Sequence, residues 1–196
     1  ATDKINKEEK RIIDKIIKKE TAIKAYYIFN LIGIASGFYA AYQVEKMWFG
    51  IIFVYFAISL WRYSKQHKTS FIIGNLQVAF LTALSIINLA IYDLIPIGIT
   101  IGNEPKIIFY IILFYAGFAF ITTLIREIIK DLEDIEGDKN INAQTLAITY
   151  GIKKTKWIAL AFTILTFFGI AYLQYFQYSF ISSEFEYDGQ TVSLYP

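Results

Sequence analysis

Long apolar stretches alternate with short charged segments along this chain, and this alternation is its main structural signal. Five stretches are free of charged side chains: residues 25–42, 47–61, 69–92, 107–125 and 157–176. Each lies within or close to the roughly 17 to 25 residues that a helix needs to cross the hydrocarbon core of a bilayer. The pattern therefore predicts an all-α, polytopic transmembrane helix bundle with five spans.

The composition supports this class and excludes an ordinary soluble domain. Apolar residues make up 56% of the 196 residues and aromatic residues 18%, which is too apolar for a soluble protein of this size. We therefore expect an integral membrane protein that contacts the lipid bilayer and binds no nucleic acid. Cysteine is absent, so disulfide chemistry says nothing about the compartment.

The distribution of charge predicts the orientation in the membrane. Lysine and arginine gather in residues 4–24, 62–68 and 126–156, whereas the intervening loops carry few of them. By the positive-inside rule these three basic segments are cytoplasmic. The first span then enters from the cytoplasm and residues 182–196 lie outside; we expect the membrane to be a bacterial inner membrane.

Both ends of the chain resemble the middle of a longer protein. Ala1 opens a basic segment that looks like a connection between helices, and the tail after Ser182 looks like an external loop that leads to a further span. We therefore expect residues 1–196 to be a single transmembrane domain that is truncated at both ends.

An acidic run directly after the fourth apolar stretch is the sharpest chemical signal. Asp131, Asp134 and Asp138 fall within an arc of roughly 60° on one helix. Three carboxylates on one face repel each other unless a cation lies between them, and Mg²⁺ prefers such hard oxygen ligands. The alternative is a solvated helix end in which acids alternate with lysines. Against it, acids at the C-terminal end of a helix oppose its macrodipole.

Polar side chains also lie near the start of the third apolar stretch. Asn75 and Gln77 are amides just inside it, where unpaired polar groups are expensive and often functional. Alternatively, they hydrogen-bond a neighbouring helix and hold the bundle together. His67, the only histidine, lies among charges with no second metal-ligand type nearby, so we expect it to be solvated.

Three segments, in order, resemble motifs of the UbiA superfamily of membrane-embedded prenyltransferases. Asp131-x-x-Asp134-x-x-x-Asp138, preceded by Arg126-Glu-Ile-Ile-Lys130, is similar to the second aspartate-rich motif of that family. The resemblance covers nearly the whole chain. It implies nine transmembrane helices around a central cavity, of which the five spans here are helices three to seven.

The other two segments lie earlier in the chain. Tyr63-Ser64-x-x-x-Lys68, followed by Gly74-Asn75, resembles the connection between the fourth and fifth helices of the family. Asp3-x-x-Asn6 resembles the end of the first aspartate-rich motif.

The resemblance implies a role for each matched residue. The expected ligands of Mg²⁺ are Asp3, Asp131, Asp134 and Asp138. The last three and Lys68 are the expected catalytic residues. The residues expected to contact the diphosphate are Asp3, Asn6, Tyr63, Asn75, Arg126 and Lys130.

The function expected from this resemblance is the Mg²⁺-dependent transfer of a prenyl group from a polyprenyl diphosphate to an aromatic or lipid acceptor within the membrane. The sequence of the acidic run most resembles that of the geranylgeranylglycerol-phosphate geranylgeranyltransferase-like subgroup. This resemblance makes geranylgeranyl diphosphate a candidate donor. Residues 1–196 alone are expected to be inactive, because half of one metal site is missing.

The alternative is a non-enzymatic transporter or assembly subunit whose acidic loops bind cations. A transporter would more often carry ionisable residues at mid-membrane, and the five apolar stretches contain none.

Overall fold

A computed structural model describes residues 12–13, 15–97, 104–181, 185–187 and 190–192 of the chain. The long helices are α2 (Lys19–Gln43), α3 (Ile51–Lys65), α4 (Ile73–Ile97), α5 (Glu104–Glu133) and α7 (Leu146–Ile181). Shorter helical segments are η2 (Met47–Gly50), η3 (His67–Thr69) and α6 (Ile135–Asn140). After α7, the strands β1 (Phe185–Tyr187) and β2 (Gln190–Val192) pair in an antiparallel hairpin.

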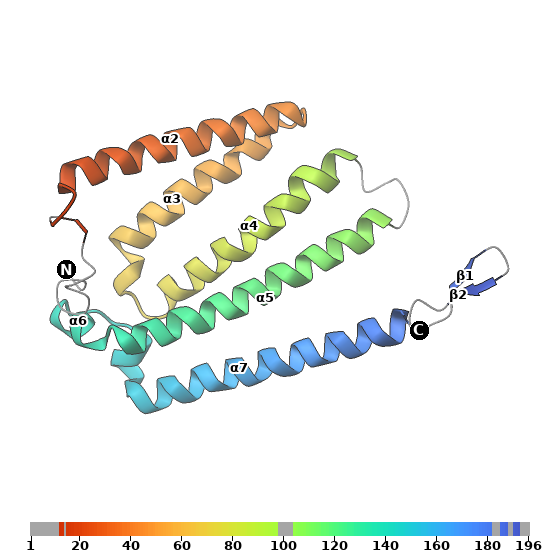
Figure 1. The fold of residues 1–196 in the computed structure, drawn as a ribbon. Helices are drawn as coiled ribbons and strands as arrows, with labels where there is room; N and C mark the ends of the chain where they lie inside the picture. The colour runs from red at the N-terminus through yellow and green to blue at the C-terminus, as the bar shows by residue number, and fades with distance from the viewer. Residues whose placement is uncertain (1–11, 14, 98–103, 182–184, 188–189, 193–196) are drawn as a thin grey trace.

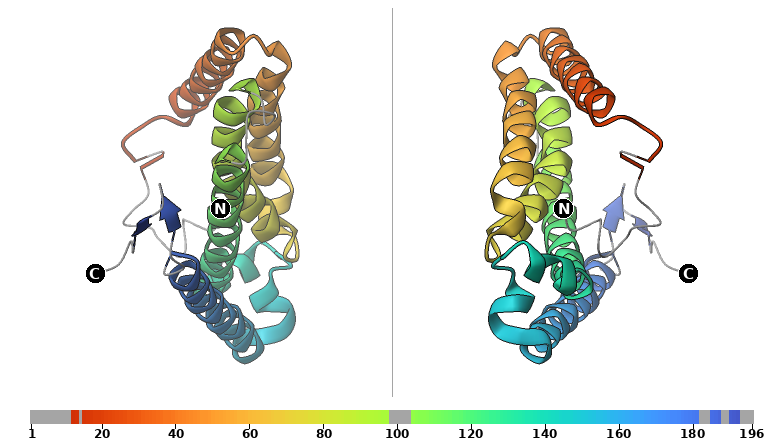
Figure 2. Two further views of the ribbon diagram at one scale, coloured as in Figure 1. Left: turned by 90° about the vertical axis from the view of Figure 1, so that its right-hand side faces the viewer. Right: turned by 90° about the vertical axis from the view of Figure 1, so that its left-hand side faces the viewer.

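The long helices run up and down and pack mainly on their neighbours in the chain. Helix α2 packs on α3, α3 on α4, α4 on α5 and α5 on α7, and the α4–α5 interface is the most extensive. Figure 1 shows the five helices side by side, and Figure 2 shows them as a curved layer with α2 and α7 at its two edges. The start of α2, the α3–α4 connection and the α5–α7 connection therefore lie at one end of the molecule.

The all-α membrane class predicted from the sequence is confirmed, apart from the small terminal hairpin. Within the residues that the structure describes, four segments are long and apolar enough to cross a membrane: Met47–Lys65, Ile73–Pro96, Ile108–Glu133 and Leu146–Tyr175. Helix α2 has 25 residues but is not among them, so the span expected at residues 25–42 stays a prediction. The stretch predicted at 69–92 begins late, because α4 starts only at Ile73.

The core lies where α4, α5 and α7 meet, close to the acidic run. Its buried members are Ala79, Leu124, Ile128, Leu146 and Ala159. Alanine from α4 and from α7 lets the helix backbones approach closely, which is how helices associate in a membrane. Large side chains elsewhere on α7, such as Trp157 and Phe167, are exposed, as expected of a lipid-facing surface.

Helix α7 contains a sharp break near its start. Gly151 has a φ of 79°, a left-handed conformation that costs glycine little. The buried Thr155 hydroxyl lies within hydrogen-bond distance of the carbonyls of Leu146 (3.3 Å) and Gly151 (3.0 Å), and its single proton is shared between them or goes to one of them. One side chain thus links the start of α7 to the residue at the break.

Towards the opposite end of the bundle, α2 and α3 pack closely against each other. Gly37 of α2 is buried, and a Cβ atom placed there would overlap the ring of Phe53. The Tyr92 hydroxyl of α4 donates a hydrogen bond to the Gly37 carbonyl at 3.3 Å. This one position therefore joins three helices.

We expect Gly37→Ala to lower the stability of the folded protein by about 1–3 kcal/mol, because the added methyl group forces the Phe53 ring out of place. Gly33→Ala is the matched control, since a Cβ there meets nothing within 4 Å and alanine favours helix over glycine. Thermal unfolding in detergent, followed by circular dichroism, measures both. Equal melting temperatures for the two variants would contradict this packing.

Candidate active site

The acidic run spans a junction between two helices. Helix α5 ends at Glu133, and Asp134 leads into α6 with φ −92° and ψ 9°. Backbone hydrogen bonds from Asp134 to Lys130 (2.9 Å) and from Asp138 to Asp134 (3.0 Å) continue across the junction. The single helix expected to carry the three aspartates is thus divided into α5 and α6 at the second of them, while helical hydrogen bonds run across the division.

Asn75 and Asp131 meet across the α4–α5 interface. The Asn75 side-chain amide, only 7% exposed, donates a hydrogen bond to a carboxylate oxygen of Asp131 at 2.8 Å. The contact supports the interpretation that Asn75 joins two helices, and it ends on an aspartate of the acidic run; the functional role of Asn75 stays a prediction.

The carboxylates of the acidic run act on one another and on nearby cations. The charge of Asp131 is repelled by Asp138 and Glu127 and attracted by Lys130. Burial and the neighbouring Asp134 carboxylate raise the pKa of Asp138, whereas Lys68 and Lys130 lower it. Lys68 and Lys130 thus come from different elements, η3 and α5, to the same acidic cluster.

Glu127 is a central residue that sequence reasoning did not identify. It is 3% exposed, and its two carboxylate oxygens pair with Arg126 (3.5 Å) and Lys130 (3.6 Å). The three-residue spacing to Lys130 was a usable signal, because such positions are neighbours on a helix. Its burial could not be predicted, since it depends on how α5 packs.

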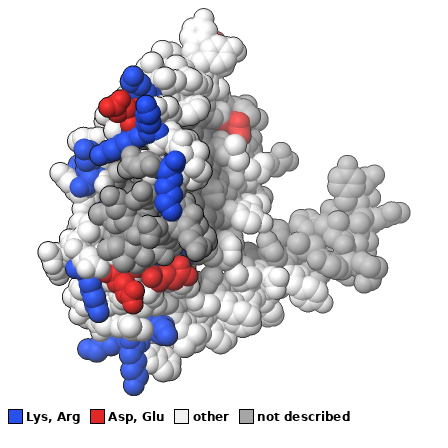
Figure 3. All heavy atoms as spheres, turned by 60° about the vertical axis from the view of Figure 1, so that its left-hand side comes forward, with Lys and Arg blue, Asp and Glu red and all other residues white. Residues whose placement is uncertain are grey.

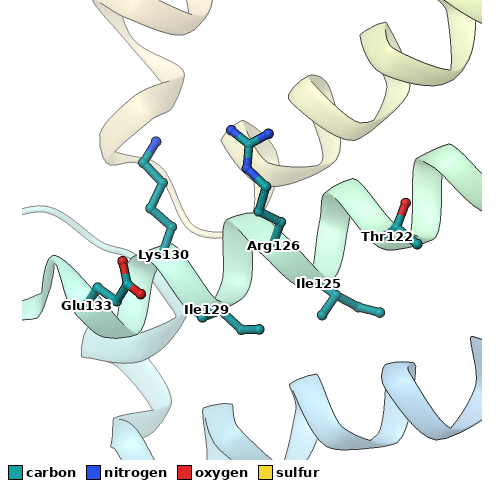
Figure 4. A pocket seen from close by; sticks show the side chains of 6 residues that line it. All are labelled: Thr122, Ile125, Arg126, Ile129, Lys130 and Glu133. Carbon is teal, nitrogen blue, oxygen red and sulfur yellow. The ribbon is translucent and has the colours of Figure 1, made fainter.

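A groove runs along one stripe of α5. It has a volume of about 380 Å³ and is lined by Thr122, Ile125, Arg126, Ile129, Lys130 and Glu133. Figure 4 shows the two cations pointing towards the α3–α4 side and the two isoleucines towards α7. The groove is therefore charged along one side and apolar along the other, which suits an amphiphilic anion.

The end of α3 and the segment that follows it carry two further predicted site residues. Tyr63, near the end of α3, is half-buried, and Lys68 in η3 is exposed. The Gln144 backbone amide donates to the Thr69 carbonyl at 2.9 Å, so η3 is tied to the loop that follows α6. Segments more than seventy residues apart in the chain are thus held together at the site.

The expectation that His67 is simply solvated was wrong, because the residue is packed against α4. It is half-buried, and its Nδ1 lies 2.5 Å from the side-chain oxygen of Gln77. The Gln77 amide nitrogen donates in turn to the Ser59 carbonyl of α3 at 2.7 Å. Gln77 therefore joins α4 to its neighbours, as one of its two interpretations held.

Charged side chains gather at the end of the molecule that carries this site. Figure 3 shows lysine, arginine and acidic side chains around that end. The described parts of all three basic segments lie there, because the helices alternate in direction. The prediction that these segments share one side is consistent with this arrangement.

The acidic run suits a hard divalent cation but does not form a complete cage by itself. Among the residues that the structure describes, no three His, Cys, Asp or Glu side chains lie close enough to hold a metal ion. Asp3 and Asn6 lie outside the described residues. Mg²⁺ commonly takes one or two carboxylates and completes its shell with water and substrate phosphates, so the partly buried, mutually repelling carboxylates of Asp131 and Asp138 fit it.

Comparisons with known proteins agree with the resemblance seen in the motifs. The model of the UbiA prenyltransferase family matches residues 1–183. A digeranylgeranylglyceryl phosphate synthase of Methanosphaera stadtmanae is 36% identical over 165 residues, covering 84% of this chain and 54% of the relative. Those of Methanobrevibacter smithii (35% identical, 83% and 54% covered) and Pyrococcus furiosus (36%, 84% and 53%) are similar.

The chain spans about half the length of the curated relatives it matches. No solved structure matches this chain. The geometry described above is therefore the structural basis for interpreting the site.

We expect Asn75→Ala to destabilise the protein by about 1.5–3 kcal/mol, because the partly buried Asp131 carboxylate loses its hydrogen-bond donor. Asn140→Ala is the control, since Asn140 is exposed and donates to the Glu136 carbonyl one turn away, on its own helix. Its effect should stay within about 0.5 kcal/mol. Thermal unfolding in detergent compares the two, and an Asn75 variant no less stable than the Asn140 variant would show that the contact contributes little.

Proposed function

This chain belongs to the UbiA prenyltransferase family, and from that premise we propose that the protein transfers a prenyl group from a polyprenyl diphosphate to an acceptor within the membrane. The observation that carries the proposal is the Asn75–Asp131 contact. It places the acidic run against α4, within the electrostatic reach of Lys68 and Lys130. A prenyl diphosphate has a multiply charged head group and an apolar chain, so it needs a charged surface and an apolar surface side by side.

Mg²⁺ is the cofactor that we propose for this site. Its expected ligands are Asp131, Asp134 and Asp138, together with Asp3 of the first motif. When bound, Mg²⁺ neutralises the charge that develops on the diphosphate as the allylic C–O bond breaks. Asn75 keeps one oxygen of Asp131 occupied and so fixes the orientation of that carboxylate.

Positively charged side chains would share the charge of the diphosphate. The charge of Lys68 in η3 acts on Asp138 of the acidic run, while Arg126 and Lys130 line the charged side of the α5 groove. Glu127 pairs with Arg126 and Lys130 and so limits the directions that these two side chains can take. Tyr63 and Asn6 are further candidates to donate hydrogen bonds to the diphosphate.

The apolar part of the groove would receive the prenyl chain. Thr122, Ile125 and Ile129 line it next to the cations. Apolar walls keep water from the allylic cation, which hydrolysis would otherwise consume. The α5 groove thus supplies both the binding surface for the chain and part of the shield around the reacting carbon.

The acceptor and donor follow from the relatives named above. Because those proteins are named digeranylgeranylglyceryl phosphate synthases, we propose geranylgeranyl diphosphate as donor and a geranylgeranylglyceryl phosphate as acceptor. We also propose that the acidic run faces the cytoplasm, on the basis of the positive-inside rule. The bacterial origin of the membrane stays a prediction.

Expressed within its complete reading frame, the protein should consume labelled geranylgeranyl diphosphate only when Mg²⁺ is present. We expect Asp131→Asn, Asp134→Asn and Asp138→Asn each to lower the rate by about 10²-fold or more, because electrostatic stabilisation of the leaving group is lost. Glu136→Gln is the matched control, an exposed acid in the same run. Equal rates in this control and the aspartate variants, or full activity in EDTA, would refute the metal site.

Filling the groove should block the prenyl chain without unfolding the protein. We expect Ile129→Trp to lower kcat/KM for geranylgeranyl diphosphate by about tenfold or more, because the indole ring occupies space along the groove. Ile164→Trp is the control, because Ile164 of α7 is similarly exposed (47% against 44%) and is not among the residues that line the groove. Unchanged kinetics in a folded Ile129 variant would place the chain elsewhere.

A further inference from the structure

The short helix η3 is held from the side of α4 by a chain of two hydrogen bonds. Gln77 lies between His67 and the backbone of α3, 2.5 Å from His67 Nδ1 and 2.7 Å from the Ser59 carbonyl. Because a carbonyl oxygen can only accept, the amide nitrogen of Gln77 must face Ser59 and its oxygen must face His67. His67 Nδ1 therefore carries the proton and acts as the donor.

The backbone of η3 is anchored on both sides of Lys68. The His67 carbonyl accepts from the Ser70 amide at 3.1 Å. It also lies so close to Gly74 that a Cβ at Gly74 would overlap it. On the other side, the Thr69 carbonyl accepts from the Gln144 amide. His67, the residue before Lys68, is thus fixed to α4, and Thr69, the residue after it, is fixed to the loop that follows α6.

The same turn of α4 serves the other half of the site. Asn75 and Gln77 are two positions apart, so their side chains leave the helix in nearly opposite directions. Asn75 reaches Asp131 on α5, while Gln77 reaches His67 and α3. One turn of helix therefore fixes an aspartate of the acidic run and the segment that carries Lys68.

We propose that His67 and Gln77 are positioning residues that hold Lys68 over the acidic run. The inference rests on the proposed function, in which Lys68 shares the charge of the diphosphate. Lysine has a long side chain that loses conformational entropy when it binds. A fixed backbone reduces the number of arrangements to be searched, and the charge of Lys68 already reaches Asp138.

The kinetic test compares variants at His67 in the protein expressed from its complete reading frame. We expect His67→Leu to raise KM for geranylgeranyl diphosphate by roughly 10- to 100-fold, because small misplacements of a binding group are costly. His67→Asn should restore most of the loss, since its amide offers an N–H donor at a similar reach. Gln66→Leu, a neighbouring exposed position, should change KM less than twofold.

A double-mutant cycle separates positioning from simple loss of stability. If His67 acts through Lys68, His67→Leu should have little further effect on KM once Lys68→Ala is present. Additive losses in the two variants, or failure of His67→Asn to restore KM, would overturn the proposal.

Hydrogen exchange gives a readout that needs no catalysis. The Gln144 amide should exchange faster in His67→Leu and Gln77→Leu, because its acceptor at Thr69 moves with η3. Unchanged exchange in both variants would overturn the proposal. If the wild type consumes no diphosphate with Mg²⁺, the proposed function fails, whereas exchange at Gln144 still decides whether His67 holds η3 in place.

Discussion

The burial of carboxylates at the edge of an apolar bundle is the constraint on which the rest of the site depends. A charged group removed from water is costly unless it is paired or hydrogen-bonded. The chain meets this requirement twice on α5, where Asp131 accepts a hydrogen bond from Asn75 and Glu127 pairs with two cations. The partners come from α4 in one case and from α5 itself in the other, so the α4–α5 interface must form before the acidic run has its final environment.

Because of this arrangement, α5 presents two chemically different faces. Glu127 and Asp131 lie on the face with buried acidic groups, and Asp131 meets α4 there. The adjoining stripe carries Arg126, Lys130 and the isoleucines of the groove. Lys130 borders both faces, since it pairs with Glu127 and also lines the groove. A single helix therefore brings the proposed metal site and the proposed binding groove for the prenyl chain next to each other.

Much of the architecture followed from the sequence because membrane spans have a strong one-dimensional signal. Apolar stretches of sufficient length predict helices, and all five predicted stretches lie largely within helices. The chemistry was harder. Asn75 and Asp131 were each singled out, but their contact joins positions 56 apart in the chain. Nothing in local spacing predicts such a pair.

The errors also have physical causes. His67 was expected to be solvated because its sequence neighbours are charged, yet Gln77 from the next helix shields it. Glu127 was not singled out from the sequence, and only packing shows that it is buried. The three aspartates were placed on one straight helix, whereas the chain bends at Asp134. In each case the missing information was tertiary.

Packing between chain neighbours has a consequence for how the protein is made. Helices that contact mainly the preceding helix can dock one after another during synthesis, without waiting for distant segments. The acidic site does not share this property, because its closing contact joins Thr69 to Gln144. The bundle can thus be largely assembled in the bilayer while η3 still awaits the loop after α6, and the site is completed only when that late segment has left the ribosome.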